Sequence, residues 1–220
     1  MRPRRFRRSS RPGPSATTLH YDECNRQVQA GELLLLDIGA EVEGYAADVT
    51  RTIPVSGQFS PEQRAIYTAV LRAQQCGIAA AKPGATLAVH AATVASVQQS
   101  LLELGLITDA TGDQYRLFFM HGTSHYVGAR RARRRQPHDP LAPGMVITVE
   151  PGIYVRADAL ITCQTARRTG RCASKVRPAF ERFKNIGVRL EDDVLVTGQG
   201  CRVMSERAPR TIDEVERHGG

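Results

Sequence analysis

Acidic residues inside apolar, strand-like segments limit the folds that this chain can adopt. A carboxylate in an apolar strand is costly to bury unless a cation or hydrogen-bond donors compensate its charge. Taken singly, each acid has a simpler interpretation, as a strand-end residue at a turn or on a solvated face. Taken together, they favour a fold that gathers several strands around one site. The four acids that interrupt or end apolar runs are Asp37, Asp48, Glu150 and Glu191.

A histidine adds a fifth donor to these carboxylates. His125 follows an aromatic segment and offers an imidazole nitrogen. Such a set of oxygen and nitrogen donors suits divalent ions of the Mn²⁺, Co²⁺ or Zn²⁺ kind, and it does not suit metals that prefer thiolates. Two such ions, roughly 3.5–4 Å apart, share a hydroxide that is nucleophilic at neutral pH. The five residues therefore predict a two-metal hydrolytic site.

Two helices are predicted in the first half of the chain. Ser60 is typical of an N-cap, and Gln63 three residues later completes a capping box. Pro61 suits the first helical position, so the first helix is expected to run from there to about Ala81. The same pattern recurs over residues 86–104, where the following glycine is a stop signal.

Short apolar segments between turn residues predict the strands. Runs rich in β-branched and aromatic residues with flanking glycines are typical of strands in antiparallel pairs. The resulting order, two strands, two helices and then several strands, predicts an α+β domain with a curved antiparallel sheet and helices on one side. The strands are expected within residues 33–38, 42–55, 116–120, 145–150, 153–155 and 185–197.

Length and composition predict one domain with basic appendages. A chain of 220 residues is long enough to bury a sizeable core. Residues 1–17 are expected to be a disordered basic tail, with an organellar transit peptide as the less favoured alternative. Residues 18–220 are expected to form the domain, in which residues 156–182 would be an irregular basic loop.

The formal net charge of +8 does not indicate a nucleic-acid-binding protein. Lys and Arg concentrate within residues 1–13, 129–135 and 165–182, and the rest of the chain is acidic. Such clusters without periodicity are usually solvated. The five cysteines form no CxxC pair, which favours reduced thiols and a cytoplasmic location. No apolar run reaches the roughly 20 residues of a membrane span, so neither nucleic acid nor a membrane is an expected partner.

Four motifs occur in the order typical of one enzyme family. DIGAEVEGYAADVTRT, HGTSH, PGMVITVEPGIY and GVRLEDDVLVT resemble the motifs of the Xaa-Pro aminopeptidase (aminopeptidase P) family. The resemblance extends from about Thr18 to Glu214. It implies the pita-bread fold of these metallopeptidases, in which helices cover a curved antiparallel sheet.

The resemblance also implies a role for each site residue. Asp37 would chelate one metal ion, and Asp48 and Glu191 would bridge both ions. His125 and Glu150 would bind the other ion, and Glu150 would also handle the proton of the attacking water. On the substrate side, His121 would hydrogen-bond to the tetrahedral intermediate and His20 would line the pocket. Arg189 would support the acidic cluster.

The implied activity is hydrolysis of the N-terminal X–Pro bond by a hydroxide that two divalent ions hold. The tertiary X–Pro amide lacks the N–H that most peptidases bind, and metal ions polarise its carbonyl without that N–H. The implied substrates are peptides with proline at the second position. The implied cofactors are two Mn²⁺ ions, with Co²⁺ or Zn²⁺ as alternatives.

The chain departs from the family pattern at two places. Ala132 stands four residues after Gly128, where the family carries a further histidine, and His138 follows six residues later. Replacement of that histidine is favoured over an insertion that would leave His138 in its role, because an insertion would shift the strand register. The family's N-terminal part is also missing, so we expect an incomplete sheet with exposed apolar faces and self-association as a homo-oligomer. A catalytically impaired metal-binding relic and a non-catalytic binding module are therefore alternatives.

Overall fold

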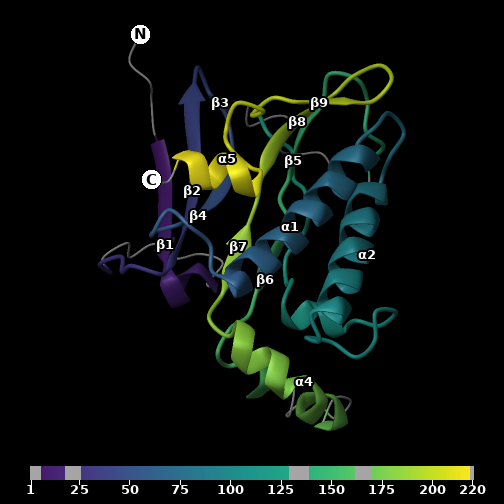
Figure 1. The fold of residues 1–220 in the computed structure, drawn as a ribbon. Helices are drawn as coiled ribbons and strands as arrows, with labels where there is room; N and C mark the ends of the chain where they lie inside the picture. Colours follow the sequence, from purple (N-terminus) through teal and green to yellow (C-terminus); the bar gives the residue numbers. More distant parts are fainter. Residues whose placement is uncertain (1–5, 18–25, 129–138, 162–169, 219–220) are drawn as a thin grey trace.

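The computed structural model describes residues 6–17, 26–128, 139–161 and 170–218 (Figure 1). Antiparallel strands form one side of the molecule, and two long helices lie side by side against them (Figure 1). This arrangement agrees with the expected α+β class. Among the described residues, none of the helices combines the length and the apolar character needed to cross a bilayer.

The first sheet is built around β2 (Leu33–Val42). β2 pairs antiparallel with β1 (Phe6–Pro12) on one side and with β4 (Val49–Pro54) on the other. The short β3 (Tyr45–Ala46) pairs antiparallel with the last two residues of β2. Leu33 and Leu35 are buried while the leucines between and after them are only partly buried, as strand alternation requires. The strands predicted within residues 33–38 and 42–55 are present, and they pair antiparallel.

The helices follow the predicted signals closely. α1 spans Pro61–Ala80, and its capping box between Ser60 and Gln63 is present in both directions. α2 spans Ala88–Glu103. α1 packs against α2 on one side and against three later strands on the other. One hydrophobic cluster joins α1, α2 and the later strands, and its largest fully buried side chains include Ile66, Tyr67, Leu101, Phe118, Phe119 and Ile153.

The remaining strands form two small antiparallel sheets. β5 (Val146–Val149) pairs with β8 (Asp192–Val196), which pairs with β9 (Cys201–Val203). β6 (Gly152–Tyr154) pairs with β7 (Gly187–Arg189). A β-bridge between Thr50 and Glu191 joins the first sheet to the segment between β7 and β8. The last helix, α5, spans Ile212–His218.

Three expectations about local structure are wrong. Residues 6–17 are not a disordered tail, because β1 pairs with β2 and a 3-10 turn, η1 (Gly13–Thr17), follows it. Backbone pairing needs an open strand edge and not an apolar composition, which explains the error. The expected strand at 116–120 overlaps the 3-10 helix η2 (Gln114–Leu117), and Phe118 and Phe119 donate their N–H groups to the carbonyl of Tyr115.

The third correction concerns the expected irregular loop at 156–182. Its last part is helix α4 (Gly170–Phe183), and residues 162–169 lie outside the described part of the chain. Val176, Phe180 and Phe183 recur at helical spacing and are buried in the main core. These apolar residues form a narrow stripe among Lys and Arg residues. The basic composition of the segment therefore indicated a loop and not a helix.

Candidate metal centre

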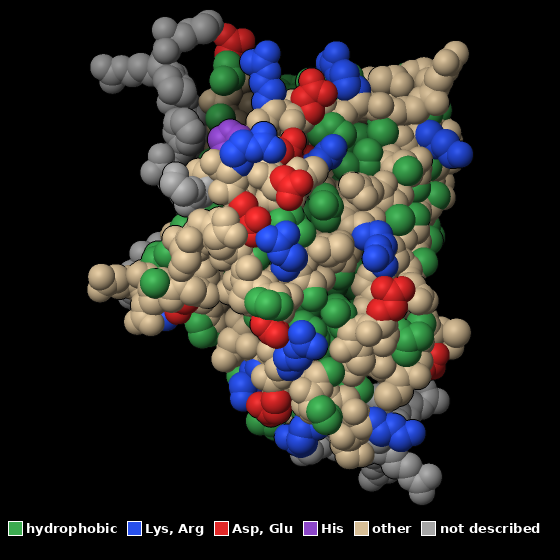
Figure 2. Space-filling view, in the orientation of Figure 1, with side chains coloured by type: hydrophobic (Ala, Val, Ile, Leu, Met, Phe, Trp, Pro, Cys, Tyr) green, Lys and Arg blue, Asp and Glu red, His purple; other side chains and the backbone are tan. Residues whose placement is uncertain are grey.

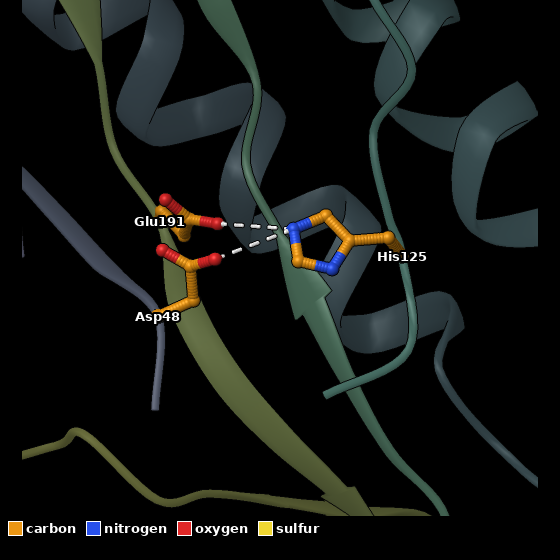
Figure 3. Close-up of side chains that lie close together, drawn as sticks. All are labelled: Asp48, His125 and Glu191. Carbon is orange, nitrogen blue, oxygen red and sulfur yellow. Dashed lines mark ion pairs between the residues drawn. The ribbon is translucent and has the colours of Figure 1, made fainter. Parts of the chain in front are cut away.

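Three of the predicted ligands converge from three separate segments (Figure 3). Asp48 directly precedes β4, His125 ends the HGTSH segment, and Glu191 directly precedes β8. Nε2 of His125 lies 3.5 Å from Oδ2 of Asp48 and 3.9 Å from Oε1 of Glu191. One potential ligand atom from each residue lies within 4.8 Å of those of the other two. These separations allow one cation to contact all three side chains.

Glu150 reaches the same histidine from the end of β5. Its Oε1 is 3.5 Å from Nε2 of His125. Thr148 holds the two residues together: its Oγ1 donates to Oε1 of Glu150 at 3.3 Å and accepts from the N–H of His125 at 3.0 Å. The N–H of Thr148 in turn donates to the carbonyl of His125 at 2.9 Å. These hydrogen bonds to Thr148 therefore fix the relative positions of the candidate ligands His125 and Glu150.

Asp37 lies on β2, opposite Thr50 of β4 in the register. Its carboxylate pairs with Nη2 of Arg189, whose residue is only 5% exposed. Nε of Arg189 also donates to Oγ1 of Thr50 at 3.3 Å, and that same Oγ1 donates to Oε2 of Glu191 at 2.5 Å. Arg189 thus lies beneath the acidic cluster and connects Asp37 to it.

His121, at the start of the HGTSH segment, is held by two aromatic side chains. Its Nε2 and the hydroxyl of Tyr154 share a hydrogen bond of 2.8 Å. Its ring meets the ring of Phe119 edge-on, with 4.9 Å between the centroids. The Tyr154 hydroxyl also accepts from Nη1 of Arg189 at 3.4 Å, so a chain of contacts runs from His121 to Asp37.

Comparison with known proteins identifies the family. The model of metallopeptidase family M24 matches residues 2–198. The chain belongs to metallopeptidase family M24. Two Streptomyces coelicolor relatives, Xaa-Pro aminopeptidase 2 and Xaa-Pro aminopeptidase 1, are 40% and 42% identical over 93% of this chain.

Solved structures of the M24 family confirm the predicted pita-bread fold. The aminopeptidase P of E. coli with the inhibitor Pro-Leu is 32% identical and matches 96% of this chain with a TM-score of 0.80. The zinc-substituted form of that enzyme in complex with product also has a TM-score of 0.80. This chain spans less than half the length of these relatives: 43% and 41% of the two Streptomyces proteins and 46% of the E. coli chain.

The electrostatics of this M24 site favour a bound cation. Burial, and then the nearby charges of Glu150 and Asp48, raise the pKa of Glu191 well above its ordinary value. Burial also raises the pKa of Glu150, although the charge of His125 opposes the rise. Carboxylates that repel one another in a buried position are stabilised by a divalent ion, which offsets both their mutual repulsion and their lost hydration. The donor set therefore fits the divalent metals that the M24 family uses.

Sequence reasoning missed several residues that support the ligands. Thr50, Thr148 and Tyr154 all lie within the quoted motifs, but their roles depend on which residues face each other across strands. Asp193 could have been predicted from the sequence more easily than these residues, because two acids follow Glu191 directly. Oδ2 of Asp193 accepts from the N–H of Asp48 at 3.0 Å, and burial raises the pKa of Asp193 to about 6. The predicted His20 and the departure at Ala132 lie outside the described residues, as does His138.

Proposed function

We propose that this chain carries the catalytic site of a metal-dependent aminopeptidase that removes the first residue from peptides with proline at the second position. The convergence of Asp48, His125, Glu150 and Glu191 in an M24 chain is the observation that supports it. The relatives named Xaa-Pro aminopeptidase support the substrate class. The inhibitor Pro-Leu bound to the E. coli relative is consistent with that class.

The proposed ligands of two divalent ions are the five residues of the sequence motifs. His125 and Glu150 would bind one ion and Asp37 the other, and Asp48 and Glu191 would bridge them. Mn²⁺ is the proposed metal, with Co²⁺ or Zn²⁺ as alternatives, because the set contains oxygen and nitrogen donors only. When bound, the ions polarise the scissile carbonyl and lower the pKa of an attacking water.

The protein's own groups would move the proton and stabilise the developing charge. A carboxylate oxygen of Glu150 is proposed to accept the proton of the attacking water, because this side chain is partly buried beside His125 and oriented by Thr148. Tyr154 and Phe119 hold the ring of His121. His121 is proposed to donate a hydrogen bond to the tetrahedral intermediate from Nδ1, in exchange for its present 2.7 Å bond to the carbonyl of Gly122. Arg189 would support the acidic cluster through Asp37, and His20 would line the substrate pocket.

One observation favours a second candidate, a metal-binding chain with impaired catalysis. Ala132 stands where the family carries a further histidine, so one substrate contact of the family would be missing. The binding-module alternative has less support. Figure 2 shows basic and acidic side chains interspersed over one face, and several are paired, such as Arg64 with Glu216 and Arg72 with Glu103. A nucleic-acid-binding surface would instead present one sign of charge.

Release of the first residue from an X–Pro peptide, with Mn²⁺ added, tests the proposal. Turnover is expected in the unsubstituted chain and its loss in Asp48→Asn. Asp109→Asn is the matched control, because Asp109 is an exposed acid in the loop after α2. Metal binding without turnover would support the second candidate, a metal-binding chain with impaired catalysis. If the chain neither binds metal nor turns over the peptide, the non-catalytic binding module is the remaining alternative. A cytoplasmic location and a homo-oligomeric state belong to the same proposal, and size-exclusion chromatography checks the second.

A further inference from the structure

One histidine outside the proposed ligand set contacts the segment that carries His121 and His125. His90 lies in the first turn of α2 and is half-buried. Its Nδ1 and Oγ1 of Thr123 share a hydrogen bond of 2.8 Å. Thr123 is the middle residue of HGTSH and is only 1% exposed. A side chain on a long helix is therefore bonded to the centre of the segment that carries both site histidines.

Thr123 also contacts the strand that ends in a candidate ligand. Its carbonyl accepts from the N–H of Glu150 at 2.8 Å. Two residues further on, the carbonyl of His125 accepts from the N–H of Thr148 at 2.9 Å. A shift of Thr123 would therefore move the backbone of Glu150 and the loop that presents His125 together.

Aromatic packing extends the same support towards His121. The ring of Phe119 lies 6.3 Å from the ring of His90 and 4.9 Å from the ring of His121, measured between centroids. Phe119 is buried in the main core. The HGTSH segment is therefore held at its start by Phe119 and at its centre by the bond between Thr123 and His90.

The geometry points to His90 as a positioning residue of the metal centre, which acts through Thr123 on the placement of His125 and of the Glu150 backbone. This inference deepens the proposed function and rests on it for the identity of the ligands. His90 itself contacts neither ligand side chain, so its role differs from that of the five ligands. Groups that orient metal ligands typically change metal affinity about 10–100-fold when they are removed.

The charge state of His90 supports the role. Burial, and next the positive charge of Arg116, lower the pKa of His90 below its ordinary value. The imidazole is then neutral near pH 7, and its hydrogen bond to the Thr123 hydroxyl does not require a buried charge.

Mn²⁺ affinity, measured from the electron paramagnetic resonance signal of free Mn²⁺, tests the inference without substrate. His90→Leu and Thr123→Val each remove one partner of the bond, and the Mn²⁺ Kd is expected to rise about 10-fold in each. His90→Asn and Thr123→Ser keep a polar atom near Nδ1 or Oγ1 and are expected to recover most of the loss. His218→Leu, in the last turn of α5, is the matched control and leaves the Kd unchanged.

The double variant distinguishes positioning from general damage. If both residues act through one bond, His90→Leu with Thr123→Val raises the Kd no more than either change alone. An unchanged Kd in both single variants, or losses that multiply in the double variant, would overturn the inference. Equal losses in the Leu and Asn variants of His90 would overturn it too, because they would reflect packing only.

The outcomes also separate this inference from the proposed function. Mn²⁺ binding that depends on His90 without X–Pro turnover would refute the aminopeptidase activity and keep the positioning role. X–Pro turnover with a Mn²⁺ Kd that does not change in the His90 and Thr123 variants would support the aminopeptidase activity and refute the positioning role. If the unsubstituted chain binds no Mn²⁺, both are refuted.

Discussion

The two sides of the candidate metal centre differ in how firmly the protein holds them. On the side of β5 and β8, Glu191 and Glu150 expose 3% and 17% of their side chains. On the side of the first sheet, the side chain of Asp48 is 34% exposed, and the neighbouring Ile38, Val42 and Tyr45 are exposed apolar residues. Packing thus fixes Glu191 and Glu150, although the side chain of His125 beside them is 49% exposed. The sheet side relies on a few polar contacts, among them Arg189 with Asp37. Because of this difference, we expect substitutions on the two sides to have different effects on metal binding and on stability.

The largest effect is expected at Glu191, the buried carboxylate that is proposed to bridge the two ions. Glu191→Gln keeps the size of the side chain and the neighbourhood of Thr50, but it removes the charge. Turnover of an X–Pro peptide should fall more than about 100-fold, because a direct ligand matters more than the residues that orient it. The metal-free protein should keep or gain thermal stability, since a neutral side chain relieves the repulsion from Glu150 and Asp48. A drop in the Tm of the metal-free protein would contradict the account of this side.

The next largest effect concerns the contact that ties the exposed side to the core. Arg189→Met leaves the carboxylate of Asp37 without its buried partner and removes the bond to Thr50. Loss of one member of a fully buried ion pair costs about 3–5 kcal/mol, and a smaller loss of stability is expected here because the side chain of Asp37 is 27% exposed. Urea unfolding measures the change, and the double variant with Asp37→Asn should recover part of the loss. If the double variant is less stable than Arg189→Met, the pairing is not what stabilises Asp37.

The same substitution, Val to Thr, at one position on each side tests whether the two sides differ in burial. Val149→Thr places a hydroxyl at a fully buried position in β5, which costs about 1–3 kcal/mol. Val42→Thr changes the exposed end of β2, where the expected change is within about 0.5 kcal/mol. Chemical denaturation of both variants provides the measurement. Equal losses would mean that the end of β2 is as buried in solution as β5.

The last expected effect is a pH dependence of the metal-free protein, which accumulates over the whole range between two pKa values. The folded-state pKa of Asp193 is raised to about 6 from an ordinary value of 3.8, mainly by burial. A group with a raised folded pKa binds its proton more tightly in the folded state, so its contribution is present below the unfolded pKa and is lost as the pH rises between those two values. The free energy of unfolding should then fall by at most about 1.4 kcal/mol per pH unit for one such group. Urea titrations between pH 4 and 6.5 check the slope. Asp193→Asn should reduce it, and the raised pKa values of Glu150 and Glu191 should maintain the remainder.

The sequence predicted the residues of the site better than the contacts among them. Asp37 in β2 and the acids that flank β4, β5 and β8 were detectable because a carboxylate in an apolar segment needs compensation. The Ser60 capping box located α1. Tyr154 and Thr148 were missed because their partners depend on strand register. α4 was missed because its three buried apolar residues lie among basic ones, and η2 because an apolar run fits a buried turn as well as a strand.

A Mn²⁺ titration of the unsubstituted chain and of Glu191→Gln, with the bound metal counted per chain, is the decisive experiment for the metal centre. Two ions are expected per unsubstituted chain, and fewer ions bound with a higher Kd in Glu191→Gln. Equal stoichiometry and Kd in the two proteins, or no bound metal in either, would contradict the assignment of this cluster as the metal centre.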